Sequence, residues 1–282
     1  MEFTFLDALS LPGDPAKPND DAWGQTSTAA VVLDGATNLC EPLLPGDSDA
    51  AWLARFAARR LMAHAQDGRP ARASLEAALG EAQRSFAGLR RRPPTRNHEN
   101  PHASMMFVTA AQDGFDALWF GDCGALALPP AGPAQIVGDA FDKRAAEARR
   151  VRMLADAKGL APAARASRPE FLSALRAARD TVNTDKGGWL FGPDPKAAEH
   201  VRSAHVAAAP GTLLLLASDG FLALACDFAC HDADGLIAAA RDKGLEALGI
   251  QLRAVENDDP DGRKFPRFKT SDDATAVLLR LG

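Results

Sequence analysis

Cysteine and long apolar runs are scarce in this chain of 282 residues. Its four cysteines are too few for a disulfide framework at this length, which favours a reducing, cytoplasmic location. The longest aliphatic run, 213–216, is far shorter than the ~20 apolar residues that a membrane-spanning helix needs. The first residues, MEFTFLDALSLPGDP, lack the basic start and the apolar stretch of a signal peptide. We therefore expect a cytoplasmic protein without a membrane partner.

An excess of positive charge is also missing. Lys and Arg number 32 against 37 Asp and Glu, so the formal net charge is −5. A chain with this balance has no global field that would attract nucleic acid or an anionic membrane. A phosphate-bearing partner would have to be held at a local site, and a bound cation is the obvious device for an acidic protein.

The composition that is present belongs to a globular protein with a large core. Hydrophobic residues make up 46% and charged residues 24% of the chain, which excludes disorder, collagen and coiled coil as overall descriptions. No repeat or low-complexity linker divides the sequence, and layered folds often reach ~250 residues as one unit. We expect a single domain over residues 1–282, present as a monomer.

Hydrophobic patterning predicts strands and helices that come in blocks rather than in strict alternation. Strands are expected at 28–33, 104–111, 115–120, 125–128, 203–208, 212–217 and 275–281. Helices are expected at 48–61, 73–89, 234–243 and 245–255, and over most of 141–179. The three strands between 104 and 128 should form an antiparallel meander. This order favours an α+β fold, with helices laid on antiparallel sheets.

A Gly- and Pro-rich segment, VNTDKGGWLFGPDP at 182–195, interrupts the predicted elements. Long loops of this composition are commonly functional. We expect its part from Gly187 to Pro195 to be a mobile flap that influences which substrates enter.

Acidic residues recur where predicted strands meet loops. Asp34 and Asp219 should end their strands and are each followed by Gly, and Asp272 begins the last strand. A further pair, Asp20-Asp21, lies in the first loop. Asp-Gly is also a turn dipeptide, so any one of these acids could be a turn residue only. Acids from distant strand ends can nevertheless converge on one edge of a packed pair of sheets, where a hard cation such as Mg²⁺ or Mn²⁺ would offset their repulsion.

Six short motifs, in order along the chain, resemble those of one family. They are Asn19-Asp20-Asp21-Ala22, Val32-Leu33-Asp34-Gly35, Phe120-Gly121-Asp122-Cys123, Val182-Asn183 with Gly187-Gly188, Leu215-Leu216-Ala217-Ser218-Asp219-Gly220 and Ser271-Asp272-Asp273-Ala274-Thr275. Each is weak alone, but together they span nearly the whole chain. The sequence thus resembles the metal-dependent Ser/Thr protein phosphatases of the phosphatase 2C (PPM) family.

The resemblance implies a fold and an activity. The fold would be a four-layer α-β-β-α sandwich of two stacked antiparallel sheets flanked by helices. The activity would be direct hydrolysis of phosphoserine and phosphothreonine in proteins, in which a metal-activated water attacks phosphorus without a covalent phosphoenzyme. The partner would be a phosphorylated protein substrate, in a signalling role.

The resemblance also implies metal ligands at one end of the sandwich. Asp34 would bridge two Mg²⁺ or Mn²⁺ ions, the Gly35 carbonyl would bind one of them, and Asp219 and Asp272 would hold the second. Acids with outer roles would be Asp20 and Asp21, acting through metal-bound waters, and Asp122, at a third and looser ion.

Three departures from the family lie near the expected site. Ala36 stands where animal members carry a His thought to protonate the leaving oxygen, and Gly124 replaces the Arg of one motif. Ala16 stands where a phosphate-binding Arg usually lies; the adjacent Lys17 could be a catalytic, substrate-binding point charge or a solvated loop residue. The departures leave open a catalytically weak phosphatase-like module that binds or regulates phosphoproteins. A phosphatase for a small phosphorylated metabolite is a third interpretation.

A histidine pair fits the H-E-x-x-H pattern of zinc proteases, from His98 to His102. That chemistry needs both rings on one helical face, and Pro101 within the pattern opposes a helix. We therefore reject the protease interpretation. If a residue other than one at position 36 protonates the leaving group, His98 and His102 are the first candidates.

Two further patterns have simple structural interpretations. Cys226, Cys230 and His231 lack a second ligand pair, so small buried cysteines on a helix are favoured over a zinc site. Four arginines at positions 90, 91, 92 and 96 form a basic loop, interpreted as a solvated face. A docking site for an acidic or phosphorylated partner is the alternative for this loop.

Overall fold

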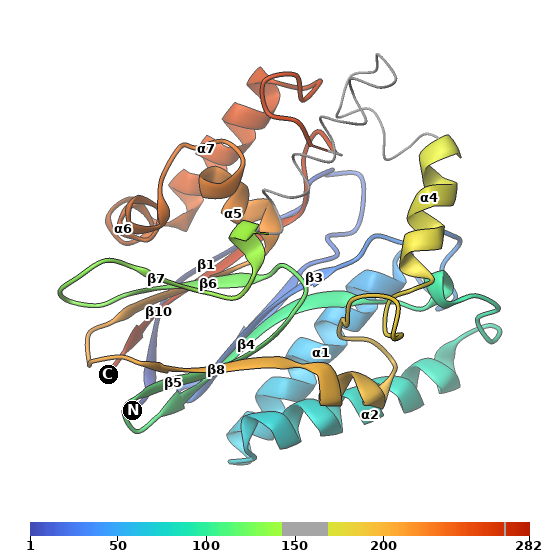
Figure 1. Cartoon of the computed structure of the whole chain (residues 1–282), viewed down its shortest axis with the longest axis horizontal. Coiled ribbons are helices and arrows are strands. Elements are labelled where there is room, and N and C mark those ends of the chain that lie inside the picture. The colour runs from blue at the N-terminus through green and yellow to red at the C-terminus, as the bar shows by residue number, and fades with distance from the viewer. Residues whose placement is uncertain (143–168, 268) are drawn as a thin grey trace.

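Two antiparallel five-stranded sheets form the centre of the protein, in a computed structural model that describes residues 1–142, 169–267 and 269–282. The first sheet has the order β1 (Phe3–Leu11), β10 (Ala274–Leu281), β9 (Leu213–Ala217), β6 (Gly124–Leu128) and β7 (Gln135–Val137). The second has the order β2 (Ala22–Gln25), β3 (Ala29–Gly35), β4 (Ala103–Ala111), β5 (Gly114–Phe120) and β8 (Arg202–Ala207). The two sheets stack face to face (Figure 1).

Helices cover the outer face of each sheet (Figure 1). The second sheet is covered by α1 (Asp49–Gln66) and α2 (Ala71–Leu89). The first is covered by α5 (Asp219–Cys226), α6 (Ala233–Lys243) and α7 (Leu245–Asp258). The connections contain α4 (Pro169–Arg179) and the short 3₁₀ helices η1 (Asn97–Glu99) and η3 (Pro195–His200). This order of layers confirms the expected α+β fold, a four-layer α-β-β-α sandwich.

The core is layered because the central strands of both sheets are buried on both faces. Between the sheets, Val32 and Met106 of the second sheet belong to the same buried cluster as Leu216 and Val277 of the first. Their neighbours along β3 point the other way and pack against α1, since successive side chains of a strand alternate between its faces.

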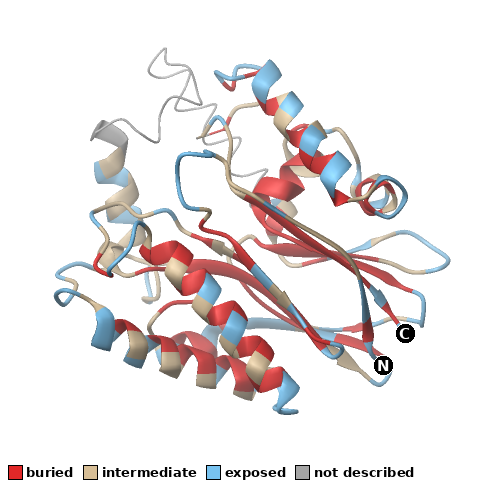
Figure 2. Ribbon diagram, turned by 180° about the vertical axis from the view of Figure 1, so that it is seen from behind, coloured by how far each residue is buried: buried red, intermediate tan, exposed pale blue. Residues whose placement is uncertain are grey.

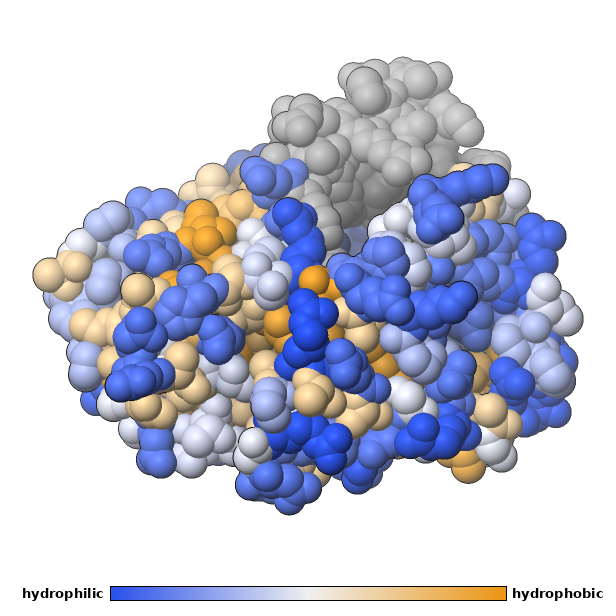
Figure 3. Space-filling model, turned by 60° about the horizontal axis from the view of Figure 1, so that its bottom comes forward, coloured by the Kyte–Doolittle hydropathy of each residue, from blue (hydrophilic) through white to orange (hydrophobic). Residues whose placement is uncertain are grey.

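The outer surface has the opposite character. Figure 2 shows the strands and the inner sides of the helices as buried and the outer sides of the helices as exposed. The face drawn in Figure 3 is mainly hydrophilic, with smaller scattered hydrophobic areas. Among the residues described, no helix combines the length and the apolar character that crossing a membrane requires.

Most of the predicted elements are confirmed to within a few residues. The start of α1 is an example: the Ser48 side chain caps the helix by accepting a hydrogen bond from the Ala51 N–H at 3.1 Å. The helix predicted over 141–179 lies mostly outside the described residues, and α4 is described at its end.

The predicted meander of three strands is wrong. β4 and β5 form a hairpin, but β6 leaves their sheet and pairs with β9 and β7 in the other one. The chain changes sheets after Gly121, whose φ of 70° is in the left-handed region that favours glycine. Apolar patterning indicates which strand faces are buried but not which strand is the neighbour, so the crossing could not be predicted from it.

The sequence patterns also miss β1, β2, β7 and α5. Two of these strands are very short, with four residues in β2 and three in β7. α5 begins at Asp219-Gly220, which reads as a turn dipeptide. The expected pair of buried cysteines on a helix is also wrong, because Cys226 ends α5, Cys230 lies beyond it, and both are half-buried.

Candidate metal centre

Acidic residues meet at the end of the sandwich opposite the chain termini, since Met1 contacts Ala111 at one end of β4 and Asp34 pairs with Ser104 near its other end. Asp34 is the penultimate residue of β3, and Asp122 lies in the connection where the chain changes sheets. Asp219 is the first residue of α5, separated from the end of β9 by Ser218 alone. One carboxylate oxygen from each lies within 4.8 Å of the other two. The structure therefore brings Asp34 and Asp219 together, as the sequence predicts, with Asp122 as the third member of this group.

The carboxylates repel one another strongly. Removal from water raises the pKa of Asp34 well above its usual range, and the charges of Asp21, Asp219, Asp272 and Asp122 raise it further. We call these five residues the acidic cluster. Like charges at such a density favour the protonated carboxyl unless a cation neutralises them.

Asp21 is the least satisfied member of the acidic cluster. Its side chain is buried, and neither carboxylate oxygen has a hydrogen-bond partner of normal geometry in the part of the chain that the structure describes. Burial raises its pKa well above the usual value, and the nearby hydroxyls of Ser218 and Thr275 offset only part of that. A buried carboxylate without donors is unfavourable, whereas a hard divalent cation would satisfy it with an all-oxygen ligand set. The residues present therefore fit Mg²⁺ or Mn²⁺.

The first-loop acids are fastened to the last motif by Asp273, a residue for which the sequence predicts no role. Its Oδ2 accepts a hydrogen bond from the Asp20 N–H at 2.7 Å, and its Oδ1 accepts one from the Gly13 N–H at 2.7 Å. The Asp20 carboxylate in turn accepts a short hydrogen bond from the Ser48 hydroxyl, at the start of α1. Two separate segments, at Ser48 and at Asp273, thereby hold the loop of Asp20 and Asp21 at the edge of the acidic cluster.

The glycine after each Asp of the two Asp-Gly pairs permits a close approach. A Cβ at Gly35 would lie 2.4 Å from the Asp20 carbonyl oxygen, and a Cβ at Gly220 would lie 2.0 Å from the Asp273 carbonyl oxygen. Any larger residue would therefore push an acid-bearing segment away. The two dipeptides are more than turn signals, because their glycines let the segments that carry the acids pack together.

Two cations that sequence reasoning missed lie beside the acidic cluster. Lys269 Nζ donates to Asp272 Oδ1 at 2.6 Å and to the Thr37 hydroxyl at 3.2 Å. Arg179, at the end of α4, donates to the Thr37 carbonyl at 2.6 Å and to the Ala36 carbonyl at 3.2 Å. Burial lowers the pKa of Lys269, but Asp272 and the other acids outweigh it and raise the value, so the ammonium stays charged. Its only sequence signal is the spacing of three residues before Asp272.

Lys17, predicted as the substrate-binding charge, lies in the loop before Asp20. Its Nζ is 3.4 Å from Asp14 and its side chain is 73% exposed. Its role stays a prediction.

Two buried groups near the acidic cluster, the His102 ring and the Cys123 thiol, are uncharged at neutral pH. Burial and the charge of Arg179 lower the pKa of His102 to about 3, so its ring is neutral at pH 7, which argues against this residue as the leaving-group acid. Burial and the surrounding acids raise the pKa of the Cys123 thiol well above its usual value, which argues against a thiolate nucleophile. His98 lies in the short 3₁₀ helix η1, and its ring Nδ1 is hydrogen-bonded to Asp180 Oδ1 at 2.9 Å. The two histidines therefore do not share an α-helix, as a zinc protease requires.

The Gly- and Pro-rich segment is tied down at several points. The Asn183 side chain brackets Leu190, accepting from its N–H at 2.8 Å and donating to its carbonyl at 3.2 Å. Phe191 is buried and exchanges two backbone hydrogen bonds with Ala103 at the start of β4. The predicted loop is present beside β4, and its role in substrate entry stays a prediction.

Comparison of the sequence with models of known families and with curated proteins finds no match. Solved structures do match. The Mycobacterium tuberculosis serine/threonine phosphatase PstP/Ppp is 13% identical, with a TM-score of 0.59 over 100% of this chain and 99% of its own. The PPM Ser-Thr phosphatase MsPP from Mycobacterium smegmatis, solved with cacodylate, is 19% identical, with a TM-score of 0.55 over 99% of this chain and 100% of its own. The catalytic domain of PstP with two manganese ions is 15% identical, with a TM-score of 0.56 over 99% and 98%. The chain therefore has the fold of the PPM serine/threonine phosphatases.

Proposed function

We propose that this protein is a metal-dependent phosphatase that hydrolyses phosphoserine and phosphothreonine in proteins. The observation that carries the proposal is the acidic cluster, in which Asp34, Asp122 and Asp219 converge within 4.8 Å. It lies in a fold shared with solved serine/threonine phosphatases, one of which holds two manganese ions. The oxygens of buried Asp21 add to it, because no hydrogen-bond donor among the described residues reaches them in normal geometry and a cation would satisfy them.

The metal ligands in this proposal are the acids that the sequence motifs mark. Asp34, the Gly35 carbonyl, Asp219 and Asp272 would hold two Mg²⁺ or Mn²⁺ ions. Outer contacts, made through water or to a third ion, would come from Asp20, Asp21 and Asp122. Bound there, the cations would supply Lewis-acid chemistry, acidifying water and neutralising phosphoryl oxygens.

The other residues of the site position the substrate. Lys269 and Arg179 place two positive charges beside Thr37, two residues after the Asp34-Gly35 pair. We propose that they attract the phosphate and thereby take over the role of the missing Arg at position 16, with Lys17 as the alternative. Because Ala36 carries no acidic proton and His102 is neutral, the leaving oxygen would take its proton from water.

The finer assignments belong to the same proposal. The substrate would be a phosphorylated protein in cytoplasmic signalling, and the enzyme would act as a monomer without nucleic-acid or membrane partners. The net charge of −5 supports a locally built phosphate site rather than a general polyanion-binding surface.

The test is manganese-dependent hydrolysis of p-nitrophenyl phosphate and of a phosphothreonine peptide, each with and without chelator. We expect both activities to need the metal and to fall by about 10²–10³-fold in Asp34→Asn, the size of loss seen when one electrostatic stabiliser is removed. Asp47→Asn, an exposed acid, is the matched control. Phosphopeptide binding without turnover in the wild type would instead support the catalytically weak module, which Ala16 and Ala36 favour.

A further inference from the structure

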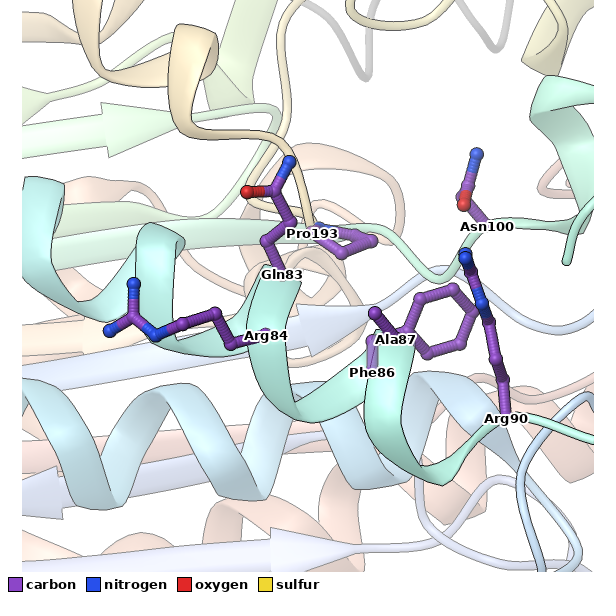
Figure 4. A pocket seen from close by; sticks show the side chains of 7 residues that line it. All are labelled: Gln83, Arg84, Phe86, Ala87, Arg90, Asn100 and Pro193. Carbon is purple, nitrogen blue, oxygen red and sulfur yellow. The ribbon is translucent and has the colours of Figure 1, made fainter.

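A cavity of about 360 Å³ lies on the surface beside the last turns of α2 (Figure 4). Its lining includes Gln83, Arg84, Phe86, Arg90, Asn100 and Pro193. These residues come from α2, from the loop after η1 and from the Gly- and Pro-rich segment. In Figure 4 the Arg90 side chain runs beside the Phe86 ring toward Asn100, while Gln83 and Pro193 lie on the other side.

The arginines of this cavity are its chemically distinctive feature. In the basic loop, Arg92 is paired with Glu99 at 2.8 Å and Arg96 with Asp180 at 3.0 Å. Arg90 and Arg84, by contrast, have no acidic partner among the residues that the structure describes. The guanidinium of Arg90 lies 5.7 Å from the centre of the buried Phe86 ring, which holds its planar fork in place. Arg90 therefore gives the cavity a positively charged group that is held in a fixed orientation and is not paired with a carboxylate of the described residues.

Among the residues that the structure describes, no acid lines this cavity, and the acids next to it in sequence are engaged elsewhere. Glu99 accepts hydrogen bonds from Arg92 and from the Thr95 N–H at 2.7 Å. Asp194 accepts from the Lys196 N–H at 3.1 Å. The side-chain amides of Gln83 and Asn100 add neutral donors. In a protein of net charge −5, this is a local site for negative charge.

One residue of the cavity, Asn100, also belongs to a neighbouring cleft. Asn100 lines both the cavity and a second, narrow cleft, whose wall includes Ala36 and Arg179. Ala36 directly follows the Asp34-Gly35 pair. The cavity therefore lies beside a cleft whose wall also contains the residue that follows Gly35.

From these observations we infer that the cavity is a docking subsite for an acidic segment of the phosphoprotein substrate, with Asp, Glu or further phosphorylated residues flanking the target. Arg90 and Arg84 would pair with the carboxylates or phosphates of that segment. This inference rests on the proposed function for the identity of the partner. The docking itself depends only on charge and shape, so the two can be tested separately.

The first test measures binding without catalysis. A short fluorescein-labelled peptide rich in Asp and Glu, without phosphate, is titrated in chelator, against an Asn- and Gln-rich peptide of equal length. We expect tighter binding of the acidic peptide, weakened about 10-fold by Arg84→Glu with Arg90→Glu, because each reversal replaces an attraction by a repulsion. Arg59→Glu, an exposed arginine on α1, is the matched control and should change binding less than about 2-fold.

Milder variants guard against loss of folding. Arg84→Gln and Arg90→Gln remove the charges and retain long polar side chains. They should also weaken binding of the acidic peptide, by less than the charge reversals do. The inference is overturned if the acidic peptide binds no tighter than the neutral one, or if Arg59→Glu weakens binding as much as the double reversal.

The second test uses turnover. The double reversal should raise KM for a phosphothreonine peptide with acidic flanks about 10-fold, with kcat and p-nitrophenyl phosphate hydrolysis unchanged. An inactive enzyme that still binds the acidic peptide through these arginines would disprove the proposed function and retain the docking subsite. An active enzyme whose KM depends neither on the acidic flanks of the peptide nor on the two arginines would support the proposed function and disprove the docking subsite.

Discussion

Lys269 is the residue that most changes the picture of the site. Its Nζ forms an ion pair with Oδ1 of Asp272, a proposed metal ligand, at 2.6 Å, and the Lys269 side chain is 40% exposed. An ammonium and a divalent cation compete for the same carboxylate oxygens. Lys269 therefore affects both metal binding and the charge that the phosphate meets.

Replacing Lys269 by Gln should separate these effects. We expect Mn²⁺ to bind about 5-fold more tightly, which corresponds to the ~1 kcal/mol of a partly exposed ion pair. At the same time KM for p-nitrophenyl phosphate should rise, because the phosphate loses a positive neighbour. Calorimetric titration with Mn²⁺ and steady-state kinetics measure the two quantities.

Lys17→Gln is the decisive comparison for this prediction. Lys17 is 73% exposed and paired with Asp14, so its loss should leave both quantities unchanged. A rise in KM for Lys17→Gln but not for Lys269→Gln would assign the phosphate charge to Lys17, as the sequence predicts.

His102 sets a pH dependence of stability. The folded protein keeps its ring neutral down to a pKa of about 3, whereas the unfolded chain takes up a proton near 6.5. The contribution of the neutral His102 ring to the free energy of unfolding is therefore complete above pH 6.5. It is lost as the pH falls toward 3, at up to about 1.4 kcal/mol per pH unit.

His102→Gln should flatten this acid slope, measured by denaturant unfolding at intervals from pH 7 to pH 4. His205→Gln is the control, because Asp116 and Asp113 raise the pKa of that exposed ring and its contribution is lost as the pH rises instead. An unchanged slope in His102→Gln would mean that His102 is not held neutral in the folded protein.

At the scale of elements, the junction between β9 and α5 is the tightest point of the site. Gly220 lies there against the Asp273 carbonyl, so one added methyl group has to displace the segment that leads into β10. Overpacking of this kind typically costs 1–3 kcal/mol. Gly220→Ala should therefore lower the free energy of unfolding by about 2 kcal/mol and weaken Mn²⁺ binding.

The control for this change is Gly88→Ala in α2, where a Cβ would meet no atom within 4 Å. That substitution should be neutral or stabilise by up to ~1 kcal/mol, since Ala favours helix. Thermal unfolding and Mn²⁺ titration of both variants make the comparison. Equal behaviour of the two would show that the approach at Gly220 tolerates a side chain.

At the scale of the whole molecule, the acidic cluster works against folding when no metal is bound. Asp34 has its pKa raised by burial and by four neighbouring acids, so its charged form is destabilising at neutral pH. A ligand that binds only the folded protein stabilises it by about 2.7 kcal/mol at a hundred times its Kd.

Mn²⁺ near a hundred times its Kd should therefore raise Tm by about 5–10 °C, and chelator should reverse the change. Asp34→Asn should do the opposite of an ordinary core mutation: it should raise Tm in chelator and abolish the gain from Mn²⁺. Scanning calorimetry of both proteins in both conditions measures this. A Tm gain in Asp34→Asn equal to that of the wild type would place the metal elsewhere.

The sequence alone was sufficient for most of the elements and for picking out the acids that the structure brings together. Residues 29–35 are recognisable as a short continuous apolar run, and residues 49–66 and 71–89 because their burial recurs with the helical period of 3.6 residues, which depends only on local backbone geometry. Asp34, Asp219 and Asp272 stand out because each ends or begins an apolar run. These signals lie within a few residues of one another, so no long-range contact is needed to find them.

Only the tertiary structure decided which segments meet. The crossing of β6 to the other sheet, the bonds from Asp273 to Asp20 and Gly13, and the placing of Lys269 and Arg179 beside Thr37 all join positions far apart in the chain. The same holds for the basic cavity, since the sequence could not say which arginines of the loop find acids. Local patterns determine what each residue is able to do. The stacking of the two sheets determines which neighbours its charge meets, because contacts between distant segments depend on the packing of the whole chain.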